Sequence, residues 1–408
     1  MGLNFELTEE QAAIRQTARE FADEVVAPRA AEFDRESQFP YPIVAQMGEL
    51  GLFGLPYPEA VGGAGADLIS YLLALEEVSR ADASLGITLE AAVSLGMAPI
   101  FEFGTAEQRE RYLPELCAGR ALWAFGLSEP EAGSDAGGTR TRAAAQGSDF
   151  VVDGTKCFIT NAGTEISRGV TITAVTGSQG GRNQISAILV ERGTPGYTQA
   201  PPYRKLGWHA SDTRELSFNS CRVPRANLLG REGGGFSQFL KILEAGRVAI
   251  AALSVGVAQA CLDACLGYTQ QRRQFGRTLS RFQATQMKLA DMVTQIELAR
   301  LMVWKAGTLL DQGKPAGRFA AMAKLQASET ATWCANQAVQ IHGGAGFMED
   351  LPVARYYRDV KVNEIGEGTS EVQRLVIASH LLGFSGSVTK LIDSVPEPSD
   401  RRGPGRTI

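Results

Sequence analysis

Apolar residues recur at helical spacing near both ends of the chain and lose that spacing in the middle. At the start, Thr8-Glu9-Glu10-Gln11 is a capping box, and apolar residues follow it at helical intervals: Ile14, Ala18, Phe21, Ala22 and Val25. Thr105-Ala106-Glu107-Gln108 repeats the box ahead of another helix. Further helices are expected over 42–52 and 68–79. The pattern therefore predicts a helical domain over residues 1–122.

From Trp123 the helical period disappears, and Gly, Ser, Thr and β-branched residues take over. Asp153-Gly154 stands between two strand-like runs, and this dipeptide favours a type I′ turn, so we predict a hairpin there. Further short strands are predicted over 170–175, 186–190 and 215–218. These features indicate a compact β domain over residues 123–234.

Long helical patterns return from Gly235 onward. They cover 236–271, 282–312 and 316–341, and such lengths are typical of a helical bundle. A short helix over 351–361 and a last helix over 369–382 complete a C-terminal domain of residues 235–383. The tail 384–408 is rich in proline and charge near its end, so we expect it to be disordered. The predicted fold class is α+β and mainly α.

Composition and charge exclude several classes of protein. The chain of 408 residues is 44% hydrophobic and 21% charged with a net charge of −5, as expected for a globular protein of two or three domains. It has no basic tract, so nucleic-acid binding is unsupported. No apolar run approaches about 20 residues, so we expect no membrane span.

Cysteine and histidine usage indicates the compartment and argues against a metal site. The six cysteines form no Cys-x-x-Cys pair, which fits small core residues in a reducing, cytoplasmic location. The three histidines are too scattered for a metal centre. The chemistry must therefore come from other residues.

Glu367 is the first candidate for that chemistry, because it stands between Gly366 and Gly368 just before the last helix. Glycine has no Cβ, so the backbone here can turn sharply and lie close to another molecule. A carboxylate held in this way can face a ligand. The alternative is that Glu367 only complements the positive end of the following helix.

Three further stretches suit ligand binding. The loop 126–138 offers hydroxyls and backbone N–H groups between small residues, although a plain surface loop has the same composition. The segment 340–359 begins with a glycine turn that lets a ligand approach the main chain or simply caps a helix. Arg272-Arg273-Gln274-Phe275-Gly276, with Gln283, suits a diphosphate and an aromatic ring, or a solvated helix end.

These stretches and Glu367 occur together in one order, and the sequence resembles the acyl-CoA dehydrogenase family over residues 4–383. The stretches 126–138 and 340–359 match the family's two diagnostic motifs. The resemblance implies a homotetramer whose subunits each contain a helical domain, a β-barrel domain and a four-helix domain, with one FAD bound non-covalently to each.

The resemblance also implies roles for individual residues. It assigns cofactor binding to Phe125, Leu127, Ser128, Phe158, Ile159, Thr160, Thr369 and Glu371, and contact with a neighbouring subunit's FAD to Arg272, Phe275, Gln283, Gln340 and Gly344. Substrate binding falls to Ser134, Glu244, Arg247 and Gly368. Three positions depart from common family residues: Phe158 replaces Trp, Glu244 replaces Asp and Gly366 replaces an aromatic residue.

The implied activity is α,β-dehydrogenation of an acyl-CoA thioester. Glu367 would take the Cα proton, flavin N5 would take the hydride, and an electron-transfer flavoprotein would take the electrons. Some members carry the base at the position of Gly246, which glycine rules out here. We expect burial to raise the pKa of Glu367, with help from Glu364 and Glu371 if they are close.

Alternatives remain at this point. An acyl-CoA oxidase would use the same base and pass electrons to oxygen, and a non-catalytic scaffold would retain only the fold. Acyl-chain length depends on the pocket floor, which we expect near Leu89, Glu90 and Leu95.

Overall fold

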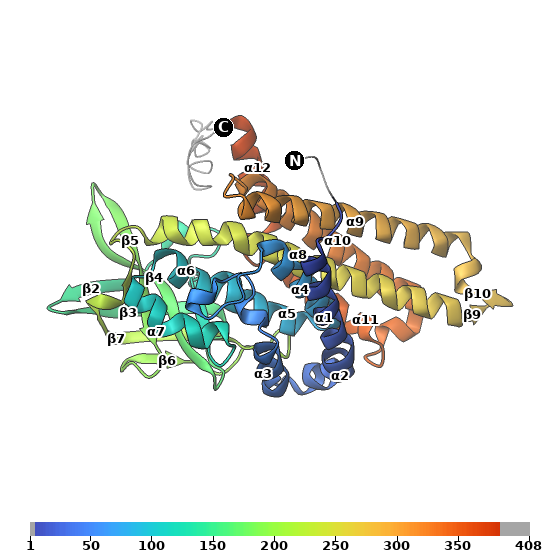
Figure 1. Cartoon of the computed structure of the whole chain (residues 1–408), viewed down its shortest axis with the longest axis horizontal. Coiled ribbons are helices and arrows are strands. Elements are labelled where there is room, and N and C mark those ends of the chain that lie inside the picture. Colours follow the sequence, from blue (N-terminus) through green and yellow to red (C-terminus); the bar gives the residue numbers. More distant parts are fainter. Residues whose placement is uncertain (1–4, 384–408) are drawn as a thin grey trace, which may run out of the picture.

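The computed structural model describes residues 5–383, with a sheet at one end of an elongated molecule and a long helical arm at the other (Figure 1). The N-terminal region is helical, as predicted, and both capping boxes are present, at Thr8 and Thr105. Its α-helices are α1 Glu9–Phe21, α2 Ala27–Glu36, α3 Tyr41–Glu49, α4 Leu68–Ala81, α5 Ala83–Glu90, α6 Ala98–Phe103 and α7 Ala106–Cys117. The π-helical segments η1 Ala22–Val26 and η4 Ala91–Met97 and the 3-10 turns η2 Leu52–Gly54 and η3 Glu59–Val61 lie between them.

The middle of the chain forms one eight-stranded sheet that is mostly antiparallel. Its hydrogen-bonded order is β6-β7-β3-β2-β4-β5-β8, and β1 pairs in parallel with β4. The strands are β1 Leu122–Gly126, β2 Arg142–Gln146, β3 Asp149–Thr160, β4 Ser167–Gln179, β5 Arg182–Glu191, β6 Tyr197–Gln199, β7 Thr213–Pro224 and β8 Leu228–Leu229. The turns η5 Ala136–Gly138 and η6 Arg225–Asn227 lie between them. The predicted fold class, mainly α with a β middle region, is confirmed.

The predicted hairpin at Asp153-Gly154 is wrong, because β3 continues through both residues. The register between β3 and β7 shifts between Val152 and Gly154, so this site is a bulge within a long strand. Gly154 has φ 151°, and a Cβ here would come within 2.5 Å of Thr141 Oγ1. The glycine therefore permits close contact with the neighbouring chain segment, a role that a dipeptide pattern does not distinguish from a turn.

Three long helices form the arm and agree closely with the predicted ranges. They are α8 Gly235–Gln271, α9 Gln283–Asp311 and α10 Gly317–His342; α11 Pro352–Asp359 and α12 Ser370–Leu382 follow. A small hairpin of β9 Arg273–Gln274 and β10 Arg277–Thr278 stands at the far tip of the arm (Figure 1). The remaining turns are η7 Leu279–Arg281, η8 Gly343–Phe347 and η9 Val360–Glu364. The predicted domain boundaries remain a prediction, and the tail 384–408 lies outside the described residues.

The expectation that no apolar stretch approaches the length of a membrane span needs a correction. Two helical stretches, Ala83–Phe103 and Gly235–Gln271, are long and apolar enough to cross a membrane by length and composition. In each, 83% of the most apolar window is buried inside the protein. The apolar residues of α8 pack against α4 and α10, so these are core helices with apolar residues on every side.

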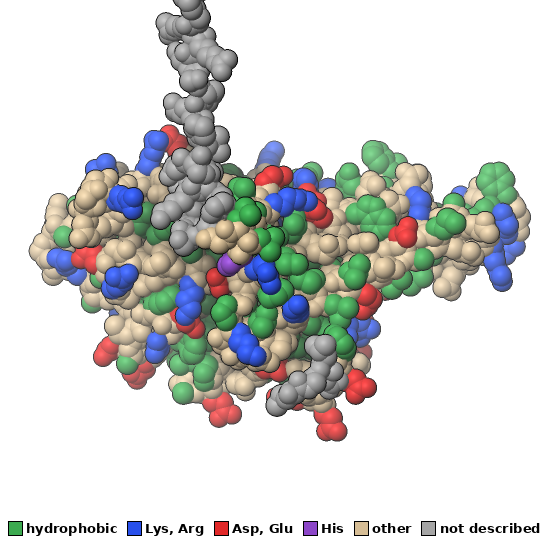
Figure 2. Space-filling model, turned by 90° about the horizontal axis from the view of Figure 1, so that it is seen from above, with side chains coloured by type: hydrophobic (Ala, Val, Ile, Leu, Met, Phe, Trp, Pro, Cys, Tyr) green, Lys and Arg blue, Asp and Glu red, His purple; other side chains and the backbone are tan. Residues whose placement is uncertain are grey.

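The six cysteines are buried and carry free thiols, in agreement with their predicted role as small core residues. On the face shown in Figure 2, acidic and basic side chains are interspersed, and hydrophobic side chains lie along the arm. Exposed apolar residues of the arm include Phe275, Met287 and Phe347.

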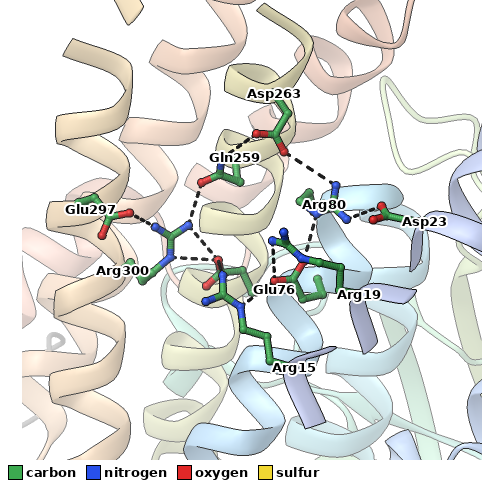
Figure 3. A network of polar contacts seen from close by, with 10 residues as sticks. Arg15, Arg19, Asp23, Glu76, Arg80, Gln259, Asp263, Glu297 and Arg300 are labelled. Atoms are coloured by element: carbon green, nitrogen blue, oxygen red, sulfur yellow. Dashed lines mark hydrogen bonds and ion pairs between the residues drawn. The ribbon is translucent and has the colours of Figure 1, made fainter. Parts of the chain in front are cut away.

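A buried ion network ties the N-terminal helices to the arm (Figure 3). Glu76 of α4 accepts a hydrogen bond from Arg300 Nε of α9 at 3.0 Å, and its ion-pair distances are 2.9 Å to Arg300 Nη2 and 3.6 Å to Arg15. Arg300 also donates to Gln259 of α8 at 3.0 Å. Burial raises the pKa of Glu76, and Arg300 opposes that shift. The pairing thus favours the ionised carboxylate where three elements meet.

We expect Arg300→Met to lower the free energy of unfolding by about 3–5 kcal/mol, because it leaves a buried carboxylate with one distant partner. Urea unfolding followed by tryptophan fluorescence measures the change. Arg29→Met, which removes an exposed i,i+3 pair with Glu32, is the control and should have little effect. Equal effects of the two substitutions would contradict the importance of the buried pair.

Candidate active site

A cavity of about 830 Å³ lies where the sheet, α8 and the turn before α12 meet. Twelve of the predicted site residues line it: Phe125, Leu127, Ser128, Ser134, Phe158, Ile159, Thr160, Glu244, Arg247, Glu367, Gly368 and Thr369. They come from distant parts of the sequence. The fold thus brings the predicted flavin positions, the predicted substrate positions and the predicted base to one cavity.

The other predicted cofactor residues lie outside this cavity. Arg272, Phe275 and Gln283 are exposed at the tip of the arm, and Gln340 and Gly344 are exposed where α10 ends. Phe275 is 93% exposed. Glu371 is exposed on the first turn of α12, beyond the cavity lining. The site within one chain therefore does not use these residues.

Glu367 occupies a backbone conformation that non-glycine residues rarely adopt. Its φ is 54°, and Gly368 follows with φ 94°, so two successive residues have positive φ. Thr369 then caps α12, with Oγ1 accepting from the N–H of Val372 at 3.2 Å. This sharp turn directs the Glu367 side chain inward while the backbone borders the cavity.

Gly246 provides the space that the Glu367 carboxylate occupies. A Cβ at position 246 would lie 2.3 Å from Oε2 of Glu367 and 3.0 Å from its Cδ. Gly246 is buried within α8, where glycine costs helix stability. Gly246 therefore lowers the stability of α8, at a position where a larger side chain would displace the Glu367 carboxylate.

The carboxylate of Glu367 is buried, and neither oxygen accepts a hydrogen bond from an N–H or hydroxyl group of the described residues. Burial raises the pKa of Glu367 to about 7, while the Glu90 carboxyl, Lys324 and Arg247 oppose the rise. Glu90 of α5 is buried too, and burial and then the charge of Glu367 raise the pKa of Glu90 well above its usual range. The two carboxyl groups therefore cannot both ionise readily.

The sheet side of the cavity offers polar groups that are free for a ligand. The hydroxyls of Ser128 and Thr160 are half-buried at the cavity wall and have no hydrogen-bond partner within residues 5–383. Beneath them, the fully buried Lys156 donates to the carbonyl of Leu127 at 3.2 Å and pairs with Glu129 at 2.6 Å. This buried pair holds the loop that presents Leu127 and Ser128.

Comparison with known proteins identifies the family of this chain. Models of the N-terminal, middle and C-terminal domains of acyl-CoA dehydrogenase match residues 8–120, 124–221 and 233–382. The chain belongs to the acyl-CoA dehydrogenase family. Members of this family are flavoprotein oxidoreductases, and the enzyme class predicted from the sequence is confirmed.

Individual relatives of this acyl-CoA dehydrogenase cover nearly all of the chain. A probable acyl-CoA dehydrogenase, YngJ of Bacillus subtilis, is 53% identical over 93% of this chain and 100% of its own. The structure of butyryl-CoA dehydrogenase from Megasphaera elsdenii is 41% identical with a TM-score of 0.90, covering 93% and 100% of the two chains. A chain in a structure of the electron transferring flavoprotein of Acidaminococcus fermentans is 43% identical with the same TM-score and coverage.

The condition attached to Glu364 and Glu371, that they lie close enough to raise the pKa of Glu367, is not met. Glu364 pairs with Lys361 at 2.5 Å, and Glu371 is exposed, so neither raises the pKa of Glu367. The interacting acid is Glu90, which was expected only at the pocket floor with Leu89 and Leu95. Leu95 does line the cavity, whereas Leu89 is buried in the core. A charged residue within an otherwise apolar helix was the available signal for Glu90.

We expect Glu90→Gln to stabilise this acyl-CoA dehydrogenase more at about pH 8 than at about pH 5. The pKa of the Glu90 carboxyl is higher in the folded protein than in the unfolded chain, where it is about 4.3. Above that pH the unfolded chain releases the proton more readily than the folded protein does, so the carboxyl lowers the free energy of unfolding as pH rises. The melting temperature at the two pH values measures this gain. Glu110→Gln on the surface of α7 is the control, and a gain independent of pH would contradict the burial of an acid at position 90.

Proposed function

We propose that this acyl-CoA dehydrogenase binds FAD and desaturates an acyl-CoA thioester between Cα and Cβ, with Glu367 as the base that removes the Cα proton. One observation carries the proposal. A buried carboxylate that no N–H or hydroxyl group of the described residues satisfies borders the same cavity as the predicted flavin-binding residues of the sheet. Such a group has few structural uses, because burying it without a donor costs free energy.

The environment of Glu367 suits a general base. A base works best when its pKa lies near the working pH, and burial brings the pKa of Glu367 to about 7. Below that pH the carboxyl holds its proton and cannot accept another. Activity should therefore rise as pH increases through about 7. An apolar acyl chain that displaces water from the cavity would favour the neutral acid further, so transfer of the Cα proton to Glu367 becomes easier.

The backbone of Glu367 supplies a second element of the chemistry. Its N–H donates to no acceptor within the part of the chain that the structure describes. Negative charge develops on the thioester oxygen as the Cα proton leaves, and a fixed donor there contributes ~3–4 kcal/mol in comparable sites. We therefore assign the N–H of Glu367 to the thioester oxygen, so one residue positions and deprotonates the substrate.

The sheet wall fits the flavin. Ser128 and Thr160 offer unpaired hydroxyls for the polar edges of a flat ring, and Phe125, Leu127 and Ile159 offer apolar contact beside them. FAD, when bound, supplies the acceptor for the hydride that leaves Cβ. The exposed residues Arg272, Phe275, Gln283, Gln340 and Gly344 then remain for the FAD of a neighbouring subunit in a homotetramer. Thr369 and Glu371 flank the turn on the cofactor side in this proposal.

The relatives support a choice of substrate and of electron acceptor. The similarity to butyryl-CoA dehydrogenase makes butyryl-CoA the first substrate to assay. Gly366 leaves open space, since a Cβ there would meet only the carbonyl oxygen of Val362 at 3.5 Å, and this space fits a branched or wider chain. The similarity to a chain from an electron transferring flavoprotein structure supports such a flavoprotein as the acceptor. A cytoplasmic location remains a prediction.

Glu367→Gln should retain FAD and lower kcat with butyryl-CoA by about 10²–10⁴-fold, the usual contribution of a general base. The measurement is anaerobic bleaching of the flavin absorbance by butyryl-CoA, with FAD content determined on the same sample. Turnover close to that of the unaltered protein would refute the assignment. Comparing reoxidation by air with reoxidation by an electron-transfer flavoprotein separates the dehydrogenase from an oxidase.

Gly246→Ala should lower kcat by about tenfold or more while leaving the fold and FAD content intact, because a displaced base loses part of its contribution. The added methyl group meets the end of a flexible side chain, so Glu367 moves and the helix does not. Gly267→Ala is a matched control, because Gly267 lies in the same helix and a Cβ there would meet no atom within 4 Å. Steady-state kinetics measures both, and equal activity of the two variants would contradict the position of the carboxylate.

A further inference from the structure

Lys324 lies behind the turn that carries Glu367. It belongs to α10 and is fully buried, and its Nζ donates to the carbonyl oxygen of Gly368 at 2.8 Å. Gln373 of α12 is also fully buried and donates from Nε2 to the carbonyls of Glu367 at 3.1 Å and Gly368 at 2.9 Å. Both carbonyl groups of the turn therefore have donors that are buried.

The turn requires such support. Glu367 and Gly368 both have positive φ, and a non-glycine residue keeps that conformation only where its surroundings hold it. A neutral donor would satisfy a carbonyl at lower cost than a buried ammonium group, because removing a charge from water is expensive. The presence of lysine thus indicates a use for its charge as well as for its hydrogen bond.

We propose that Lys324 is the positioning residue for the base: it holds the turn so that the Glu367 carboxylate faces the substrate cavity, and its charge favours the ionised carboxylate. This inference rests on the proposed function of Glu367. It assigns Lys324 no contact with substrate, since Lys324 is absent from the cavity lining.

The titratable groups around the Glu367 carboxyl come from four helices. They are Tyr71 of α4, Glu90 of α5, Arg247 of α8 and Lys324 of α10. Glu364 and Glu371 also act on Lys324. Burial lowers the pKa of Lys324 to about 8, so the ammonium form prevails at neutral pH. Lys324 and Arg247 are the cations that lower the pKa of Glu367, so loss of Lys324 leaves one opposing cation.

The decisive experiment is the pH profile of kcat/KM for Lys324→Met, which keeps most of the length of the side chain and removes its charge and donors. We expect the part of the profile where activity rises with pH, its rising limb, to move to higher pH by about one unit. This is the effect on the pKa of Glu367 of losing one nearby opposite charge. The shift alone lowers activity at about pH 7 by about fivefold, and the deficit is smaller at about pH 9. FAD content should match that of the unaltered protein.

Two further variants separate position from charge. Gln373→Met removes only neutral donors, so kcat should fall without a shift of the pH profile. Lys305→Met removes an exposed lysine that lies 4.2 Å from the ring centroid of Phe319 on α10, and it should change neither kcat nor the profile. A uniform loss of activity at every pH for Lys324→Met, with the limb unmoved, would show a merely structural lysine and overturn the proposal.

If Lys324→Met does not fold, Lys324→Gln replaces it, because glutamine keeps a donor without the charge. It should show the same upward shift with a smaller loss of kcat, and an unmoved limb overturns the proposal here too. Glu367→Gln assayed in parallel separates a failure of the proposed base from a failure of the positioning role of Lys324. If Glu367→Gln retains turnover, the proposed base is wrong; if it is inactive and the Lys324 variants show no shift, only the positioning role is wrong.

Discussion

A carboxylate withdrawn from water with no basic group hydrogen-bonded to it is costly, and the arrangement around Glu367 depends on tolerating that cost. Both oxygens are buried, and no N–H or hydroxyl of the described residues donates to them. The charge is compensated at a distance by Arg247 and Lys324, which are themselves buried cations with lowered pKa values. Compensation without a direct ion pair leaves the oxygens free, so the group can accept a proton from a ligand.

The contrast with Glu76 shows how the same residue type serves stability. Glu76 is also buried, but Arg300 donates directly to it, and the pair joins helices from separate parts of the chain. Glu129 and Lys156 form a similar direct pair beneath the loop at the sheet wall. In these pairs a buried acid with a basic partner holds elements together. Glu90 and Glu367, which have no such direct partner, lie close to each other beside the cavity.

Helices whose stabilising interactions join residues close in the sequence were predicted correctly from the sequence. Capping boxes at Thr8 and Thr105, and the helical spacing of α8, α9 and α10, depend on residues a few positions apart, and these elements agree with the structure. The Asp153-Gly154 prediction failed because the glycine lies against Thr141, a contact made through the sheet. No individual helix was predicted over 83–103, because its apolar residues point in all directions and show no period.

For the site, the sequence was enough to single out Glu367 and the glycines beside it, since a carboxylate between glycines is visible in the letters alone. It also supplied the residues of the cavity's sheet wall through motif resemblance. The partners that set the properties of Glu367 come from other helices: Glu90 from α5, Gly246 from α8 and Lys324 from α10. Electrostatic interactions depend on distance in space, and only packing of these helices brings the groups together.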